Sequence, residues 1–237
     1  MAAAQGDQNG LIGEVRARLA KARRVFVFTG AGLNPAVEEP AFGASTPLPF
    51  FEDPVAVWGW FDEHRARLAA AGPDAAHRAL AQLESSTPGF ALATESVDGL
   101  HRLAGTRNVL ELRGNVWVVR CTRCGLRSVN REIPIRNPPS CPVCTGLVRP
   151  GILWRGEHFP QELLVNCFEA LSKCAVLIVA GTTILNHPAS LFAEVARKAS
   201  AYLVEIAPEP PAAEAQVDAL LVGTAQEILP RIADPRT

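Results

Sequence analysis

The sequence predicts an α/β fold, a doubly wound parallel sheet with a second, smaller domain built on a structural zinc module. Short β-rich apolar runs alternate with helical patterns along most of the 237 residues, which is typical of a parallel sheet covered by helices. The run Ala175–Ala180 is apolar on both faces, as expected of a central strand in such a sheet. Four cysteines between residues 121 and 144 interrupt this alternation with the spacing of zinc ligands.

The first part of the chain begins the alternation. Residues 1–10 are small and polar, and we expect them to form a disordered tail. Leu11–Ala22 carries apolar residues at helical spacing and leads into the strand Val25–Thr29. This strand ends in Gly30, Ala31 and Gly32, and glycines there let the backbone approach a phosphate, although many ordinary tight turns also use two glycines. From Asn34 to Pro54 the composition is that of a loop lying over a site.

Two helices and two strands follow before the cysteines. Trp58–Ala71 and Ala75–Glu84 have helical patterns, and Asp74 stands where it can cap the second helix. We expect His77, within that helix, to be a structural side chain rather than a ligand. The two strands are Gly89–Thr94 and Val109–Leu112.

The alternation resumes after the cysteines. The predicted elements are a helix at Glu162–Lys173, the strand Ala175–Ala180, a helix at Pro188–Ala199, a strand at Tyr202–Ile206 and a helix at Ala225–Ile232. Ligands of doubly wound sheets bind beyond the carboxyl ends of the strands, where Gly181, Thr182 and Thr183 stand. Cys167 and Cys174 are expected to be buried small hydrophobes rather than a redox pair.

The overall charge limits the classes of partner. A net charge of −1 gives no electrostatic reason to expect nucleic acid or an anionic membrane as the partner. No apolar run reaches the roughly 18 residues of a membrane span, and the first residues lack the apolar centre of a signal peptide. With its thiols assigned to zinc, the protein is expected in a reducing compartment, the cytoplasm.

Cys121, Cys124, Cys141 and Cys144 form the pattern C-x2-C-x16-C-x2-C. Each C-x2-C turn directs two thiolates at one ion, and two turns complete the tetrahedral shell that Zn²⁺ prefers. Because four sulfurs leave no ligand position open, the predicted site is structural and not catalytic. The alternatives are two disulfides or four reduced thiols. The zinc module is expected at residues 115–145, and the large sheet in residues 11–114 and 146–237.

A series of motifs occurs in one order along the chain. They are Gly30-Ala-Gly32 after an apolar strand, Val97-Asp-Gly-Leu-His101, Glu111-Leu112 with Gly114, the four cysteines, Leu147-Val-Arg-Pro150, Trp154 with Gly156-Glu157, and Gly181-Thr-Thr183 before Pro188-Ala189. Together they resemble the sirtuins, the NAD-dependent protein lysine deacylases, from about Arg24 to Ile232. The resemblance implies a Rossmann-like domain and a smaller domain that adds a helical insertion, about residues 35–75, to the zinc module. It also implies that NAD and an acyl-lysine protein or peptide meet between the two domains.

The resemblance also implies which residues form the site. For NAD they are Gly30, Ala31, Gly32, Glu95, Ser96, Asp98, Gly181, Thr182, Thr183 and Ala225, and for the peptide Trp154, Gly156 and Glu157. The family's catalytic histidine, which deprotonates a ribose hydroxyl, falls at Arg113. A guanidinium stays protonated above about pH 12 and cannot act as a general base, and loss of a positioned base typically lowers a rate by about 10²–10⁴.

Further departures from the family pattern lie where NAD and the acyl group are expected. The glutamine and asparagine that precede Asp98 in the family are Glu95 and Ser96 here. Other changed positions are Asn34, Phe42-Gly43, Arg155 and Ala207. Phe61 and His64 stand at the positions where some members of the family recognise acidic acyl groups, and neither matches the residues used there, so desuccinylation is not predicted. The zinc ligands and the strands are spared. This pattern suggests a scaffold kept for something other than efficient deacylation.

Glu95 and Arg113 occupy positions that face the ribose in the family, and we hypothesise an ion pair between them that could occlude NAD. Arg113 could instead hold another anionic ligand, or both side chains could face solvent. Two functions are compatible with these residues. One is a catalytically impaired or silent sirtuin fold that binds a ligand, a peptide or a partner protein, or serves as a structural subunit. The other is an active divergent enzyme that deacylates slowly or transfers ADP-ribose, with Glu95, Asp98 or His101 as acid or base. The sequence leaves NAD binding undecided between them.

Overall fold

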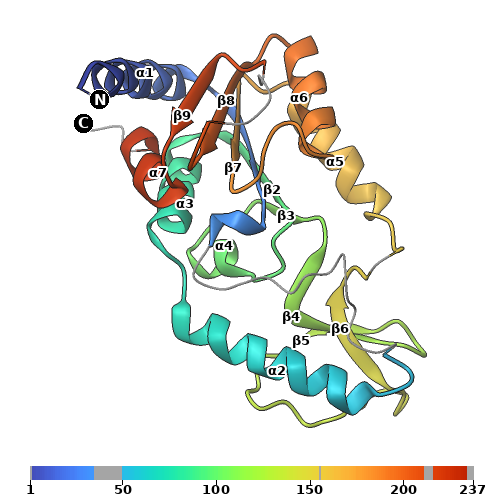
Figure 1. Ribbon diagram of the computed structural model, residues 1–237. Coiled ribbons are helices and arrows are strands. Elements are labelled where there is room, and N and C mark those ends of the chain that lie inside the picture. The colour runs from blue at the N-terminus through green and yellow to red at the C-terminus, as the bar shows by residue number, and fades with distance from the viewer. Residues whose placement is uncertain (1, 35–49, 155, 211–215, 234–237) are drawn as a thin grey trace.

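The computed structural model describes residues 2–34, 50–154, 156–210 and 216–233 (Figure 1). Its main feature is a six-stranded sheet in the order β3-β2-β1-β7-β8-β9, in which every neighbouring pair is parallel. The strands are β1 (Arg24–Thr29), β2 (Gly89–Thr94), β3 (Val109–Glu111), β7 (Val176–Ala180), β8 (Tyr202–Ala207) and β9 (Ala219–Val222). The doubly wound parallel sheet is therefore confirmed. Its strand order reverses between β1 and β7, the switch point at which such sheets bind ligands.

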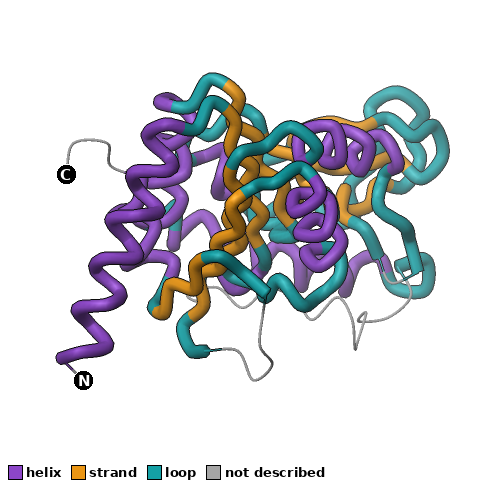
Figure 2. The backbone as a smooth tube through the Cα atoms, turned by 90° about the horizontal axis from the view of Figure 1, so that it is seen from above, coloured by secondary structure: helices purple, strands orange, loops and turns teal. Residues whose placement is uncertain are grey.

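Helices cover both faces of this sheet because its strands are apolar on both faces. On one face, Val25 and Val27 of β1 pack with α1 (Ala2–Lys21), α3 (Ala75–Ser86) and α7 (Ala225–Ala233). On the other face, Phe26 and Phe28 pack with α5 (Gln161–Leu171) and α6 (Ala189–Lys198), where the ring of Phe192 stands edge-on to both at 6.0 and 5.1 Å. Figure 2, seen from above, shows the strands between two layers of helix.

A second sheet of three strands lies below the first in Figure 1. In it β4 (Gly114–Cys121) pairs antiparallel with β5 (Arg127–Val129) on one side and β6 (Val148–Ile152) on the other. Helix α2 (Pro54–Ala71) covers one face, where the buried Trp58 donates from Nε1 to the carbonyl oxygen of Val148 at 2.7 Å. The small sheet extends past the expected limits of the zinc module, 115–145, because β6 is needed to pair with β4.

Helix α1 begins at Ala2 and runs through the segment that was expected to form a disordered tail, residues 1–10. Contacts with the other end of the chain hold this segment. Gln8 donates to the carbonyl oxygen of Val222, and Arg231 donates to Oδ1 of Asn9 at 2.7 Å. Alanine and glutamine at residues 2–5 favour a helix, whereas Gly6 and Gly10 do not, so the contacts of Gln8 and Asn9 help to hold this part of α1.

Most expected helices and strands are present, with changes at their ends. Helix α2 starts at Pro54 rather than Trp58, because Asp53 caps it by accepting from the N–H of Ala56 at 2.9 Å and proline suits the first turn. The predicted cap Asp74 of α3 is confirmed, since its side chain accepts from the N–H of His77 at 3.1 Å. The elements missed were α4 (Leu100–Leu103), a 3-10 turn at Ala31–Leu33, β9 and the strands of the small sheet. Most of them are too short to show a repeating pattern.

Part of the expected organisation lies outside the described residues. This holds for most of the loop Asn34–Pro54, for residues 35–49 of the helical insertion, and for the altered positions Phe42, Gly43 and Arg155. Among the helices in the described ranges, none is both long enough and apolar enough to cross a membrane.

Candidate active site

The candidate site begins at the switch point, where the loops after β1 and β7 touch. The N–H of Gly30 donates to the carbonyl oxygen of Ala180 at 3.0 Å, and that of Gly32 to the carbonyl oxygen of Gly181 at 2.9 Å. A Cβ on Gly30 would lie 2.5 Å from the oxygen of Gly181, and a Cβ on Gly181, whose φ is +69°, would lie 2.3 Å from the nitrogen of Leu33. These loops therefore require glycine, and they present bare backbone of the kind that approaches a phosphate.

Buried polar groups support the loop from below. Thr29 Oγ1 and His101 Nε2 share a hydrogen bond of 2.9 Å, and burial lowers the pKa of His101 to about 3, so the ring is neutral. The side chain of Gln226, next to the buried Ala225 on α7, donates to Asp74 Oδ2 at 2.7 Å and also to the carbonyl oxygen of Leu33. His77 Nδ1 lies 2.7 Å from Asp74 Oδ1, which confirms the structural role expected of His77.

The loop after β7 is held from the neighbouring strand by a buried carboxylate. Glu205 of β8 is fully buried, and its Oε1 accepts from the N–H of Ile184 at 3.2 Å, just beyond Thr182 and Thr183. Thr183 Oγ1 accepts from the N–H of Leu185 at 3.3 Å. The sequence-based predictions did not include Glu205. The available signal was a single acid inside the otherwise apolar strand Tyr202–Ile206.

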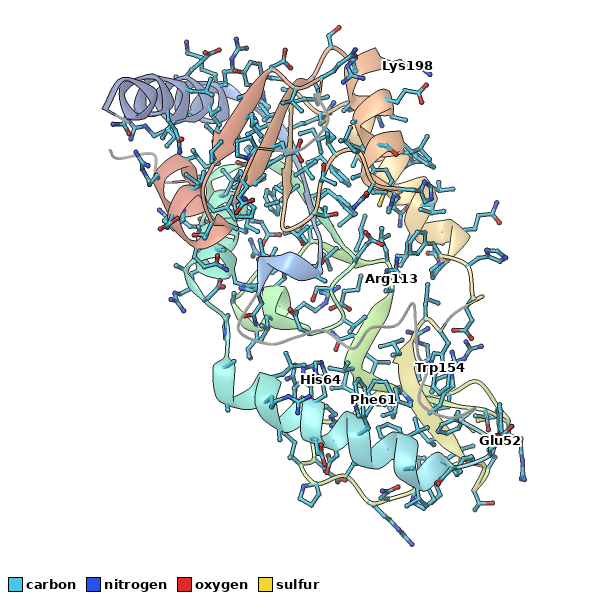
Figure 3. The ribbon with its side chains drawn as sticks, viewed as in Figure 1. Glu52, Phe61, His64, Arg113, Trp154 and Lys198 are labelled. Atoms are coloured by element: carbon cyan, nitrogen blue, oxygen red, sulfur yellow. The ribbon has the colours of Figure 1, made fainter. Side chains whose placement is uncertain are left out.

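Glu95 and Arg113 form the hypothesised ion pair. Arg113 lies in the two-residue link between β3 and β4, where the large sheet passes into the small one (Figure 3). Its Nε and one terminal nitrogen donate to Glu95 Oε1 at 2.9 and 2.7 Å. The Glu95 side chain is 13% exposed and that of Arg113 41% exposed, and the guanidinium carbon lies 5.6 Å from the centre of the Phe159 ring. The alternative in which both head groups turn to solvent is therefore wrong.

Asp98, the other expected acid, is committed to the fold. It is buried, and its Oδ1 accepts from the N–H of Leu100 at the start of α4 at 2.7 Å. Its carbonyl oxygen accepts from Nε1 of Trp117 on β4 at 2.8 Å, which ties this segment to the small sheet. Ser96 is also buried and accepts from the N–H of Asp98 at 3.4 Å. The hydrogen bonds of Asp98 and Ser96 therefore hold the backbone of this segment in place, and they already use a side-chain oxygen of each residue that would have to accept a proton.

The residues expected to meet a peptide form a turn after β6. The N–H of Glu157 donates to the carbonyl oxygen of Trp154 at 2.9 Å, and Glu157 Oε2 accepts from the N–H of Trp154 at 2.9 Å. Gly156 has a φ of +88°, which suits glycine. The Glu157 carboxylate accepts from Arg149 at 2.8 and 2.9 Å. In Figure 3, Trp154 lies at the end of β6, while Phe61 and His64 rise from α2 toward β4.

The four cysteines of the zinc pattern come together at the far end of the small sheet. Their sulfurs all lie within 4.8 Å of one another, with Cys121 and Cys144 at 3.4 Å and Cys124 and Cys141 at 3.7 Å. A tetrahedral ion with bonds of about 2.3 Å to sulfur requires separations of about 3.8 Å, so this donor set fits Zn²⁺. The backbone N–H groups of Cys124 and Arg123 lower the pKa of the Cys121 thiol, whereas the neighbouring thiols raise the pKa of Cys124.

All six cysteines are free, so the alternative of two disulfides is not realised. Cys167 and Cys174 are buried, and burial raises the pKa values of their thiols to about 12 and about 11. The expectation that these two residues act as small hydrophobes is confirmed.

Known proteins share this architecture. Residues 37–188 match the model of the Sir2 family. An NAD-dependent protein deacylase of Aeropyrum pernix is 42% identical over 205 residues, covering 81% of this chain and 84% of the relative. A Sir2 homologue solved in complex with NAD is 30% identical with a TM-score of 0.82, covering 93% of this chain and 92% of the other. Sir2Af2 bound to a myristoylated histone peptide is 30% identical with a TM-score of 0.74, covering 96% of each chain.

Proposed function

The chain belongs to the Sir2 family, and we propose that it is a zinc-containing member that binds NAD and an acyl-lysine peptide but is impaired as an NAD-dependent protein lysine deacylase. The observation that carries the proposal is the ion pair between Glu95 and Arg113, at hydrogen-bond distances of 2.9 and 2.7 Å. It stands where the family resemblance expects a histidine base facing the ribose.

The chemistry of the pair explains the impairment. A guanidinium stays protonated at any working pH, so Arg113 can donate hydrogen bonds but cannot take a proton from a ribose hydroxyl. Of the two acids expected at the site, Asp98 is buried and accepts from the N–H of Leu100, and Oε1 of Glu95 already accepts two hydrogen bonds from Arg113. A positive charge beside the nicotinamide ribose would also oppose the cationic character that develops there when nicotinamide leaves.

NAD binding is proposed because the loops that would meet its phosphates keep their form. Gly30, Gly32 and Gly181 bring two loops together through their backbones at the switch point of the sheet. A Sir2 homologue of the same fold holds NAD in its crystal structure. The residues proposed to contact NAD are those expected from the sequence, namely Gly30, Ala31, Gly32, Glu95, Ser96, Asp98, Gly181, Thr182, Thr183 and Ala225.

Peptide binding needs no catalytic base. An extended peptide can pair with the backbone of the turn at Trp154, Gly156 and Glu157, as other extended peptides add to exposed strands. The family member Sir2Af2 was solved with a myristoylated histone peptide, which supports an acyl-lysine peptide as the partner. We assign Cys121, Cys124, Cys141 and Cys144 to structural zinc, and these reduced thiols suit the cytoplasm.

Calorimetric titration of NAD into zinc-loaded protein, with and without an acetyl-lysine peptide, tests the proposal together with a deacylation assay. We expect both ligands to bind, and deacylation to run at least about 100-fold slower than that of the Aeropyrum pernix relative assayed beside it. Deacylation at the relative's rate would contradict the proposal. Failure of NAD to bind, with the peptide still bound, would limit the protein to recognition.

The same assay tests the alternative of altered chemistry. Release of nicotinamide without deacylation, or transfer of ADP-ribose, would show that the site cleaves NAD by another route. The Glu95→Gln variant then asks whether the one carboxylate held beside Arg113 takes part, because amide and carboxylate have the same shape but differ in basicity.

A further inference from the structure

A row of three arginines crosses the small sheet on the face away from α2. Arg120 of β4 stands directly opposite Arg127 of β5 on one side and Arg149 of β6 on the other. Residues directly opposite each other in antiparallel strands project to the same face, so the three side chains form one row about 10 Å long. The neighbouring positions Val119, Cys121 and Val148 are buried on the opposite face, with Trp58 of α2. The arginine row therefore lies on the open face.

Three positive charges side by side repel one another, so the arginine row is unfavourable unless an anion binds to it. Like charges placed directly opposite each other destabilise a strand pair. Arg120 and Arg127 are exposed, and neither forms an ion pair with any other residue in the described ranges. The segment Gly114–Ile152 holds six arginines and a single acid, Glu132, a net +5, whereas the rest of the chain carries −6. Four thiolates with Zn²⁺ would reduce the +5 to about +3 and leave this segment basic.

One end of the row already binds a carboxylate. The Arg149 side chain, 16% exposed, donates to both oxygens of Glu157 at 2.8 and 2.9 Å. Glu157 belongs to the turn that is proposed to pair with the peptide. The arginine row thus leads from the proposed peptide site across the sheet to its outer strand. Beside it Val129 is 69% exposed, which offers apolar contact next to the charges.

We propose that the arginine row binds acidic side chains that flank the acyl-lysine, so that the protein selects acidic segments of its partner proteins. This inference rests on the proposed peptide-binding role and names the class of peptide. Arginine suits carboxylates because its planar guanidinium carries several N–H donors, and one terminal nitrogen of Arg149 already donates to both oxygens of Glu157. A protein segment fits better than nucleic acid, because the remaining −6 of the chain would repel a long polyanion.

The test uses the full zinc-loaded protein and two acetyl-lysine peptides that differ only in carrying three glutamates or three glutamines on each side of the lysine. Fluorescence anisotropy measures their affinities at low and at physiological salt. We expect the glutamate peptide to bind about tenfold more tightly at low salt, and less so as salt screens the charges. Equal affinities, or no binding of the glutamate peptide, would overturn the proposal.

Charge reversal assigns the effect to the row. Arg127→Glu and Arg120→Glu should each remove most of the preference for glutamate and leave the glutamine peptide within about twofold of its wild-type affinity. The matched control is Arg23→Glu, which makes the same change at an exposed position near the amino end of β1. Zinc content and thermal unfolding show whether each variant is folded. If a charge-reversal variant does not fold, Arg127→Gln replaces it in the binding measurements.

Separate measurements distinguish this inference from the proposed function. Binding of NAD and of the glutamine peptide tests the proposed function, whereas the difference in affinity between the glutamate and glutamine peptides tests the arginine row. An unchanged glutamate preference in both reversal variants would assign it to other residues and overturn the proposal. Binding of a polynucleotide or of anionic vesicles that depends on Arg120 and Arg127, with no preference between the peptides, would overturn it in favour of a different partner.

Discussion

The two halves of the large sheet's carboxyl edge are held by different kinds of contact. After β1 and β7, the loops meet backbone to backbone, so that a Cβ on Gly30 or Gly181 would lie 2.5 or 2.3 Å from backbone atoms. After β2 and β3, the edge ends in Glu95 and Arg113, joined by side-chain hydrogen bonds of 2.9 and 2.7 Å. At Gly30, Gly32 and Gly181 the first half tolerates almost no change, because a Cβ there would collide with the neighbouring loop.

The second half can change without harm to the fold. Glu95 donates its N–H to the carbonyl oxygen of Thr29, and Arg113 accepts at its own carbonyl oxygen from Leu153, so both positions are held by groups that every residue has. Their side chains decide only the chemistry. This explains how a chain can keep the architecture of a deacylase family and replace the residue expected to act as base.

The largest effect is expected from a change in the first half of the edge, the loops after β1 and β7, which we call the backbone-held half. Gly181→Ala would combine a φ of +69° with a Cβ 2.3 Å from the nitrogen of Leu33. We expect a loss of about 3 kcal/mol in the free energy of unfolding, a fall of roughly 10 °C in Tm, and loss of NAD binding. Thermal unfolding and calorimetry measure these. Gly13→Ala in α1 is the matched control, because nothing lies within 4 Å of its Cβ position and alanine favours a helix by about 1 kcal/mol. Equal behaviour of the two variants would refute the argument from close approach.

The second largest effect should come from restoring a base in the other half of the edge, where Glu95 and Arg113 meet through their side chains. Arg113→His supplies a group whose pKa lies near neutrality, and we expect deacylation to rise by about 10²-fold. The control is Arg113→Gln, which removes the positive charge without adding a base and should not restore the rate. Mass spectrometry of the peptide product measures both. A similar gain in the two variants would mean that charge, and not the missing base, limits the reaction.

Low pH should reduce the free energy of unfolding through His101, which supports the loop after β1. Burial lowers the pKa of His101 to about 3 in the folded protein, from 6.5 in the unfolded chain. Between these values the unfolded state binds more protons, so the free energy of unfolding falls as the pH drops from 6.5 toward 3. Urea unfolding at pH 7.0 and 4.5 should show that His101→Gln loses about 2 kcal/mol less than the wild type over this range. His64, whose pKa burial lowers to about 4, contributes equally to both proteins. Parallel losses would disprove the assignment to His101.

The smallest effect concerns the stability provided by the ion pair itself. Because the Arg113 side chain is 41% exposed, water screens its charge, and the coupling free energy with Glu95 should be below about 1 kcal/mol. A double-mutant cycle with Glu95→Gln and Arg113→Gln in urea measures it. A coupling of several kcal/mol would mean that the pair holds the fold together, and the two halves of the edge would then no longer differ as described.

The sequence alone determined the pattern of the large sheet and the pattern of four cysteines that we propose to bind zinc. Alternating apolar runs and helical patterns specify strands and helices because each side chain must meet either the core or water, and this rule acts locally. The spacing of Cys121, Cys124, Cys141 and Cys144 is equally local, since each pair lies in one turn. The position of Arg113 in the family motif was also readable in the sequence.

Only the tertiary structure decided which distant side chains meet. The family positions of Glu95 and Arg113 suggested an ion pair, but whether these side chains, 18 residues apart, meet or face solvent depends on β2 and β3 ending side by side. The same holds for the buried Glu205 beneath the β7 loop and for α1, whose first turns are held by contacts with Val222 and Arg231. The arginine row exists only in the register of β4 with β5 and β6. Such contacts arise from the packing of whole strands and helices, and no short stretch of sequence encodes them.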